Sequence, residues 1–241
     1  MSDFSVLNES SLHNTLKIYY ASQTNGKTEV EMHGHIYDVF TEDGQVIEIQ
    51  TKNLSKLSKK IKDTLEKGLK VTLVYPVPAT TKIILTDEQG KFISSRKSPN
   101  KGSVYDIFKE TTGLYNILLH KNFTLEVVFI TMIEHRVRTE EPVQAKNNRR
   151  RFRKNWIKSN KKLEEIIEIK HFKTKKDYLS LLPPALPHQF CAKDIKERLK
   201  SEKLAPAKIY NNSNLILWVL NKMELLEYTE TRNRSKYYKV K

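Results

Sequence analysis

Residues 29–51, EVEMHGHIYDVFTEDGQVIEIQT, constrain the fold more than any other stretch, because they predict β-strands joined by a tight Glu-Asp-Gly turn. In the first part of this stretch, alternate side chains point to one face, among them Met32, Ile36 and Phe40. Asp38 falls on that same face. The pattern therefore places a carboxylate among residues that are expected to form the core.

Two further polar residues are expected beside Asp38. Antiparallel partners keep a constant index sum, so folding the stretch about Asp43 sets Asp38 nearly opposite Glu48. The two-residue period then puts Gln50 on the same side as Glu48. Carboxylates held together in an apolar setting are costly unless a cation lies between them. The arrangement predicts a divalent metal site with oxygen ligands.

The residues before this stretch predict an amphipathic helix over 5–21, with Leu12 and Leu16 on its buried stripe. Glu9 shares that stripe, where a glutamate needs a partner. The alternative interpretation of Glu9 is a first-turn acid that the helix dipole favours.

The residues after it predict a second amphipathic helix over 53–67 and a buried strand at 71–75, VTLVY, which ends at Pro76 and Pro78. The lysines of that helix are expected on its outer face, which is usually a solvated face. Because this face begins directly beyond Gln50, contact with phosphate is the alternative. A strand–helix–strand unit implies a right-handed crossover and a parallel pair. With residues 29–40 divided near Gly34, the order is αβββαβ, and the fold class is α/β with a mixed sheet.

This order of elements, with Glu9, Asp38 and Glu48-Ile49-Gln50 at these places, resembles the PD-(D/E)xK superfamily of restriction endonuclease-like and Holliday-junction-resolvase-like nucleases. The resemblance covers roughly residues 5–75. It implies that Asp38 and Glu48 bind Mg²⁺ or Mn²⁺, that Glu9 is the additional acid of resolvase-like members, and that Gln50 stands where the family has lysine.

Gln50 departs from the family pattern, since a glutamine is neither a charged base nor a cationic stabiliser. Some members with glutamine or glutamate in that place are active and others are not. The resemblance therefore implies two alternatives, an active nuclease in which Gln50 positions the water, or an inactive DNA-binding protein on a decayed core.

The rest of the first domain is expected to contain a hairpin over 81–96, a helix from Val104 to about Thr111 and a long strand over 124–138. A basic loop that begins at Arg96 and Lys97 is a candidate contact for the DNA backbone, although exposed loop lysines are common.

A strongly basic stretch follows at 146–162, KNNRRRFRKNWIKSNKK, in which two aromatic residues interrupt the cations. Such a stretch is typical of nucleic-acid contact, and the alternative is a solvated linker. Residues 161–172 then predict a helix with Leu163, Ile166 and Ile167 facing inward. The candidate DNA-binding residues here are Arg149, Arg150, Arg151, Arg153 and Lys154.

The turn-rich residues 181–190 mark a domain boundary. Beyond them the sequence predicts a helix over 190–200, a second helix from Pro206 to about Met223 and a two-stranded hairpin. This order resembles a winged helix, in which the second helix enters the major groove. The positions that would contact DNA are Lys208, Asn211, Asn212 and Asn214 in the helix and Arg232, Arg234 and Lys236 in the hairpin.

The chain is therefore expected to comprise a nuclease-like core (1–145), a basic linker and helix (146–180) and a winged-helix domain (181–241). A formal net charge of +15 fits a polyanionic partner such as DNA, although a merely lysine-rich protein is the alternative. A third function stays open, that of a protein-interaction module whose basic stretch binds RNA or an acidic partner. A homodimer is an expectation of the nuclease resemblance.

Other function classes are disfavoured. A single cysteine, expected to be buried, rules out an intrachain disulfide and a cysteine-rich zinc site. Seven glycines leave little material for a phosphate-binding loop, so no nucleotide cofactor is expected. No stretch reaches 18 apolar residues and the start lacks a signal-peptide pattern, which favours a cytoplasmic protein without a membrane partner.

Overall fold

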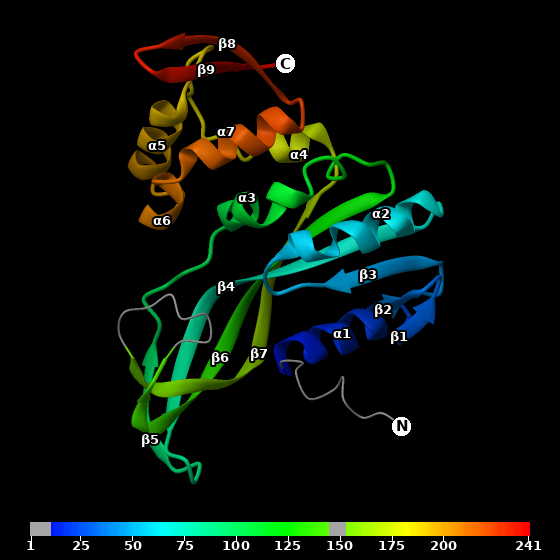
Figure 1. Cartoon of the computed structure of the whole chain (residues 1–241), viewed down its shortest axis with the longest axis vertical. Helices are drawn as coiled ribbons and strands as arrows, with labels where there is room; N and C mark the ends of the chain where they lie inside the picture. The colour runs from blue at the N-terminus through cyan, green and yellow to red at the C-terminus, as the bar shows by residue number, and fades with distance from the viewer. Residues whose placement is uncertain (1–10, 145–152) are drawn as a thin grey trace.

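The structure is a computed structural model that describes residues 11–144 and 153–241. It has the α/β architecture, with a mixed seven-stranded sheet and helices on both of its faces (Figure 1). The strand order is β1-β2-β3-β4-β6-β7, and β5 pairs with β4. The strands of this sheet are β1 (Lys27–Met32), β2 (His35–Phe40), β3 (Gln45–Ile49), β4 (Lys70–Thr86), β5 (Phe92–Lys97), β6 (Phe123–Val143) and β7 (Lys154–Phe172).

The expected division of residues 29–40 near Gly34 is confirmed, because β1 and β2 form a hairpin whose turn residues His33 and Gly34 have positive φ. The expected face of β2 is wrong, however. Ile36 is 61% exposed, and the buried residues are Tyr37 and Val39. Ile36 lies next to the hairpin turn, where β2 no longer pairs with β3.

The β3–β4 unit has the expected parallel pairing, joined through a 3₁₀ turn (Leu54–Leu57) and α2 (Ser58–Glu66). The prediction that β4 ends at Pro76 and Pro78 is wrong, since the strand continues to Thr86 and pairs with β6 along its whole length. The carbonyl of Val74 accepts the N–H of Gln50, so the backbone polar groups of Val74 face β3. Pro76 and Pro78 follow at two-residue steps, so their nitrogens face the same edge of β4, beyond the end of β3. The N–H that proline lacks therefore costs no hydrogen bond between strands.

Strands β6 and β7 form a long antiparallel hairpin. The expectation of a helix over 161–172 is therefore wrong, and residues assigned to the linker at 146–180 contribute a strand to the main sheet. The expected hairpin over 81–96 is present as the end of β4 with β5, and the expected helix at 104–111 is present as a short 3₁₀ turn followed by α3 (Ile107–Glu110).

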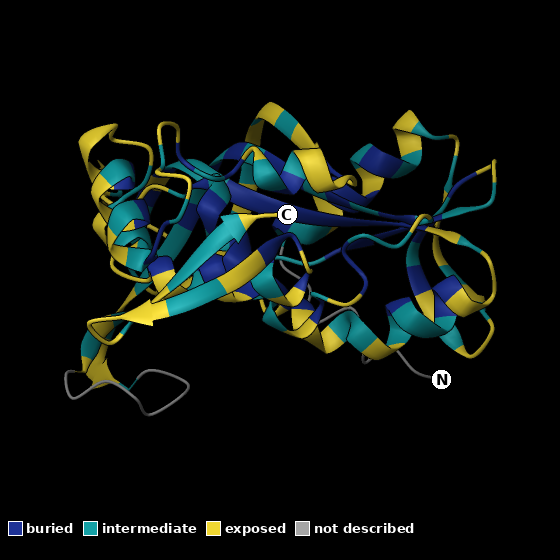
Figure 2. Cartoon of the chain, turned by 90° about the horizontal axis from the view of Figure 1, so that it is seen from above, coloured by how far each residue is buried: buried dark blue, intermediate teal, exposed yellow. Residues whose placement is uncertain are grey.

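Two apolar clusters lie on opposite faces of the sheet. Leu12, Leu16 and Tyr20 of α1 (Ser11–Gln23) pack on one face, against residues such as Val128 and Ile130. The other face packs against α2, α3 and the C-terminal helices in one continuous cluster. Figure 2 shows the strands of the sheet centre buried between helices whose outer faces are exposed.

After β7 and α4 (Lys175–Leu179), the C-terminal residues form five short elements. Cys191 is buried among these elements, as expected. The single helix expected from Pro206 to Met223 is two helices, because the chain turns at Asn211 and Asn212. The elements are α5 (Ala192–Ser201), α6 (Ala207–Tyr210), α7 (Ser213–Lys222), β8 (Leu226–Arg232) and β9 (Ser235–Val240). Across the described residues, every helix is too short or too polar to cross a bilayer.

Candidate functional site

The site forms where β2 and β3 diverge. Their ladder joins Val39 to Ile47 and Phe40 to Val46, which is the register that sets Asp38 opposite Glu48. At the next position a side chain takes the place of the backbone acceptor, because Asp38 Oδ2 accepts a hydrogen bond from the N–H of Ile49 at 2.8 Å. In return, the N–H of Asp38 donates to Glu48 Oε1 at 3.4 Å. The divergence thus brings the two predicted carboxylates together.

Asp38 is held from the other side by α1. His13 Nε2 lies 3.3 Å from Asp38 Oδ2 and 2.7 Å from the carbonyl oxygen of Ile49. Burial alone would raise the pKa of Asp38, but hydrogen bonds from His13 and from the Ile49 N–H, together with nearby positive charge, lower it below its usual value. Asp38 is therefore an anion at neutral pH.

Glu48 is paired with Lys60 of α2, whose Nζ lies 2.5 Å from Glu48 Oε1 and also donates to the carbonyl of Ile36. The expectation that the lysines of α2 all lie on a solvated face is wrong for Lys60. Burial and the charge of Asp38 raise the pKa of Glu48 to about 7, against the opposing effect of the Lys60 ammonium. The two carboxyls of the site thus differ in their affinity for a proton.

Gln50 lies at the end of β3, where its N–H donates to the carbonyl of Val74 and its Nε2 donates to the carbonyl of Lys52 at 2.8 Å. Its side-chain amide is thus hydrogen-bonded to the loop that follows, two residues beyond Glu48. Glu9, the other predicted site residue, lies outside the described residues.

The donor set suits a hard divalent cation. In the described part of the chain, Asp38 Oδ1 and Glu48 Oε2 accept no hydrogen bond, which leaves one carboxylate oxygen on each strand. The same part contains no group of three or more His, Cys, Asp or Glu side chains that could hold a metal. Magnesium fits two carboxylates nevertheless, because it keeps several waters and takes further oxygens from substrate phosphates.

The predicted DNA-binding residues of the first part of the chain lie on the sheet and beside it. Arg96 and Lys97 are exposed on β5, in the strand and not in the loop expected after it. Arg153 is exposed just before β7, and Lys154 Nζ lies 4.0 Å from the ring centroid of Trp156. Arg149, Arg150 and Arg151 fall outside the residues that the structure describes.

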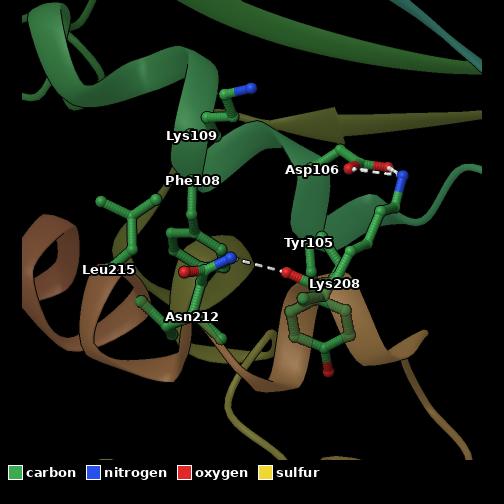
Figure 3. A pocket seen from close by; sticks show the side chains of 9 residues that line it. Tyr105, Asp106, Phe108, Lys109, Lys208, Asn212 and Leu215 are labelled. Atoms are coloured by element: carbon green, nitrogen blue, oxygen red, sulfur yellow. Dashed lines mark hydrogen bonds and ion pairs between the residues drawn. The ribbon is translucent and has the colours of Figure 1, made fainter. Parts of the chain in front are cut away.

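The predicted contacts of the C-terminal helices divide into two groups. Lys208 Nζ forms an ion pair with Asp106 Oδ1 at 3.1 Å, and Asn212 Nδ2 donates to the carbonyl of Lys208 (Figure 3). Both line a pocket of about 460 Å³ between α6, α7 and the segment that leads into α3. Asn211 and Asn214 are exposed. The first group therefore faces the N-terminal part of the molecule.

The β8–β9 hairpin presents its three predicted residues at its turn. Arg232 donates to Gln189 and Glu230, and its guanidinium lies 4.8 Å from the ring centroid of Tyr237. Arg234 and Lys236 are exposed. The free end of the hairpin is thus basic.

Lys60 is the site residue that sequence reasoning did not assign, and the sequence leaves His13 open between a core and a site position. Lys60 follows Leu57 by three and precedes Thr64 by four, so it borders the buried stripe of α2, and this was the available signal. His13 precedes the buried Leu16 by three and so borders the buried stripe of α1. Neither position could be matched to a carboxylate before the helices were placed on the sheet.

Comparison with known proteins gives a family. A family described as a domain of unknown function, DUF8091, matches residues 10–173, which contain α1 and all seven strands of the main sheet. An "Uncharacterized protein" of Treponema pallidum (strain Nichols) is 33% identical over 189 residues, which cover 78% of this chain and 72% of that protein. No solved structure matches the chain. The chain belongs to the DUF8091 family.

Proposed function

We propose that this protein is a metal-dependent DNA endonuclease of the PD-(D/E)xK type. The observation that carries the proposal is the meeting of Asp38, Glu48 and Lys60 where β2 and β3 diverge. The αβββαβ order and the parallel β3–β4 pair agree with the resemblance to this superfamily. Two acids that can hold a divalent cation and a lysine that can balance phosphate charge are the protein's part of metal-assisted phosphodiester hydrolysis.

Each residue has a distinct role in this proposal. Asp38 and Glu48 would hold Mg²⁺ or Mn²⁺, which polarises the scissile phosphate and lowers the pKa of a bound water. Lys60 supplies, from α2, the positive charge that Gln50 cannot supply, and it lies against Glu48. Gln50 offers a side-chain amide that positions the water. His13 fixes the orientation of Asp38.

The C-terminal elements support DNA as the partner. We propose that α5, α6, α7 and the β8–β9 hairpin form a winged helix, on the basis of their order and lengths. Arg234 and Lys236 at the hairpin turn are available to the DNA backbone, while Lys208 is engaged by Asp106. The wing, together with the exposed Asn211 and Asn214, is thus the part of this unit that is available to DNA in the described chain.

A second candidate function is DNA binding without hydrolysis. Lys60 and His13 already contact both carboxylates, so the buried charge is compensated without a metal. On this alternative the core is a scaffold, and the basic surfaces alone carry the function.

The deciding experiment is cleavage of supercoiled plasmid and of branched DNA with Mg²⁺ or Mn²⁺. We expect the intact protein to cut and Glu48→Ala and Lys60→Gln to be inactive, while Lys59→Gln, an exposed neighbour on α2, cuts normally. If every protein binds DNA and none cuts in either metal, the second function holds. Cutting by Gln50→Lys alone would mean that the site is intact but lacks its family lysine.

A further inference from the structure

A cluster of cations lies on the α1 side of the β6–β7 hairpin. The strand register pairs Glu134 with Lys161 and Arg136 with Lys158, and directly opposed residues point to the same face. Met132, two residues before Glu134 on β6, packs in the cluster that contains α1. The face that carries these charges is therefore the face on which α1 lies.

The acid Glu134 forms ion pairs with two of these cations. Glu134 is 4% exposed, and it forms ion pairs with Arg136, whose Nε lies at 2.7 Å, and with Lys158. The guanidinium of Arg136 lies 3.6 Å from the ring centroid of Trp156, which fixes it further. Glu134 thus compensates Arg136 and part of the charge of Lys158, and leaves the rest of the cluster positive.

Lys161 receives no such compensation. It is half-buried and forms no ion pair within 4 Å in the described part of the chain. Burial and the positive charges of Lys158 and Lys52 lower the pKa of Lys161, although the charge of Glu134 opposes them. The charge of Lys52, in the loop after β3, thus acts with that of Lys158 against the ammonium form of Lys161.

The cluster adjoins the candidate nuclease site. The carbonyl of Lys52 accepts the side-chain amide of Gln50 at 2.8 Å. Asn160, next to Lys161, accepts the N–H of Ser11 at the start of α1, the helix that carries His13 to Asp38. The loop after β3 and the start of α1 thus join the cations to the carboxylate pair.

We propose that Lys52, Lys158 and Lys161 form a binding site for a backbone phosphate of DNA, next to the pair Asp38 and Glu48. This inference rests on the proposed function, because it takes the same DNA as the ligand. A phosphate would relieve the repulsion among the three ammonium groups and replace the acid that Lys161 lacks. The DNA strand would then run from the carboxylates along the α1 side of the β6–β7 hairpin.

The test is the salt dependence of DNA binding without metal. Fluorescence anisotropy of a short labelled duplex in EDTA, at several salt concentrations, would compare the intact protein with Lys52→Gln/Lys161→Gln. The slope of log affinity against log salt is negative, and each lost phosphate contact makes it shallower by about 1. We expect the double variant to have a slope shallower by about 1 to 2 and an affinity about tenfold weaker at low salt.

The matched control removes two lysines from the opposite end of the sheet. Both lysines are exposed: Lys70 begins β4 and Lys121 precedes β6, at the ends of these strands that lie away from Glu134, the register partner of Lys161. Lys70→Gln/Lys121→Gln makes the same change in net charge, and its slope should stay near that of the intact protein. Equal losses in both double variants, or a loss in neither, would overturn the phosphate site.

Other outcomes separate this inference from the nuclease proposal. If Lys52→Gln/Lys161→Gln alone loses affinity while no protein cuts DNA, the phosphate site stands and hydrolysis fails. If the intact protein cuts and the two double variants bind alike, hydrolysis stands and the phosphate site fails. The single variant Lys52→Gln, at an exposed loop position, should lower the slope by about 1 without a change in thermal stability.

Discussion

Glu134 is a carboxylate that the sheet holds between two cations, and its ionisation stabilises the fold. Burial would raise its pKa, but the bonds and charges of Lys158 and Arg136 lower it. A lowered pKa means that the stabilisation is present above the unfolded value near 4.5 and is lost as the pH falls through the folded value. The contribution of Glu134 is therefore complete at neutral pH.

Glu134→Gln should lower the free energy of unfolding by about 1 to 3 kcal/mol at pH 7, because it leaves Arg136 and Lys158 without their anion. The difference from the intact protein should shrink as the pH falls below 4.5. Thermal unfolding across this range measures it, with Glu164→Gln on the exposed side of β7 as the control. A difference that is constant with pH would contradict the ion-pair account.

Lys60 and Glu48 are coupled, so their substitutions should not add. Lys60→Met leaves a buried carboxyl beside Asp38 and should cost about 1 to 3 kcal/mol at pH 8, with a smaller cost at pH 5, where Glu48 is protonated in either protein. Adding Glu48→Gln should recover much of that loss. Denaturant titrations of the two single variants and the double variant measure the coupling, and Lys59→Met is the control. Additive losses would show that the pair contributes nothing.

Among the elements, β7 shows why periodicity alone was insufficient. Leu163, Ile166 and Ile169 recur every third residue, which resembles a helical stripe. On the neighbouring strand their partners Met132, Ile130 and Val128 recur every second residue, because the register shifts between them. Each bulge adds a residue to β7 and turns a period of two into a period of three. Bulges leave no mark in a single sequence that separates them from a helix.

The elements around Asp38 were predictable because their signals are local. The turns at Gly34 and Gly44 and the apolar run at 71–75 have chemistry that sequence reasoning identifies directly. The same signals gave the pairing of Asp38 with Glu48. By contrast, Lys60 joins the site only through the packing of α2 on the sheet, which no short-range pattern specifies. Similarly, β4 continues past its prolines because β3 ends beside them.

The loop at Gly102 closes the edge of β4 that the prolines leave open. Its N–H donates to the carbonyl of Pro78 at 2.7 Å, and a β-carbon there would lie 2.4 Å from Val77 Cγ1. Gly102→Ala should therefore destabilise the protein by about 1 to 3 kcal/mol, since the neighbouring backbone cannot yield cheaply. Chemical denaturation measures the loss, and Lys101→Ala, at an exposed neighbour, should be nearly neutral. An unchanged midpoint for Gly102→Ala would show that the loop does not pack on β4.

At the scale of the whole molecule, the C-terminal elements are continuous with the core of the sheet. Phe108 of α3 and Ile216 of α7 belong to one buried cluster. At its border, Tyr115 meets Trp218 edge-to-face at 5.7 Å, and Asp106 pairs with Lys208. A DNA-binding unit at the C-terminus would thus be held against the proposed nuclease core and not tethered by a loose linker.

The two tryptophans of the chain test this continuity, since Trp156 reports on the β6–β7 hairpin and Trp218 on the border of the C-terminal unit. Trp156→Phe leaves the second reporter, and Trp218→Phe leaves the first. If the shared cluster makes folding cooperative, fluorescence of both variants and far-ultraviolet circular dichroism should each show a single denaturant transition. Within each variant, the fluorescence and dichroism midpoints should coincide. An earlier fluorescence transition in Trp156→Phe would mean that the C-terminal unit unfolds by itself, before the core of the sheet opens.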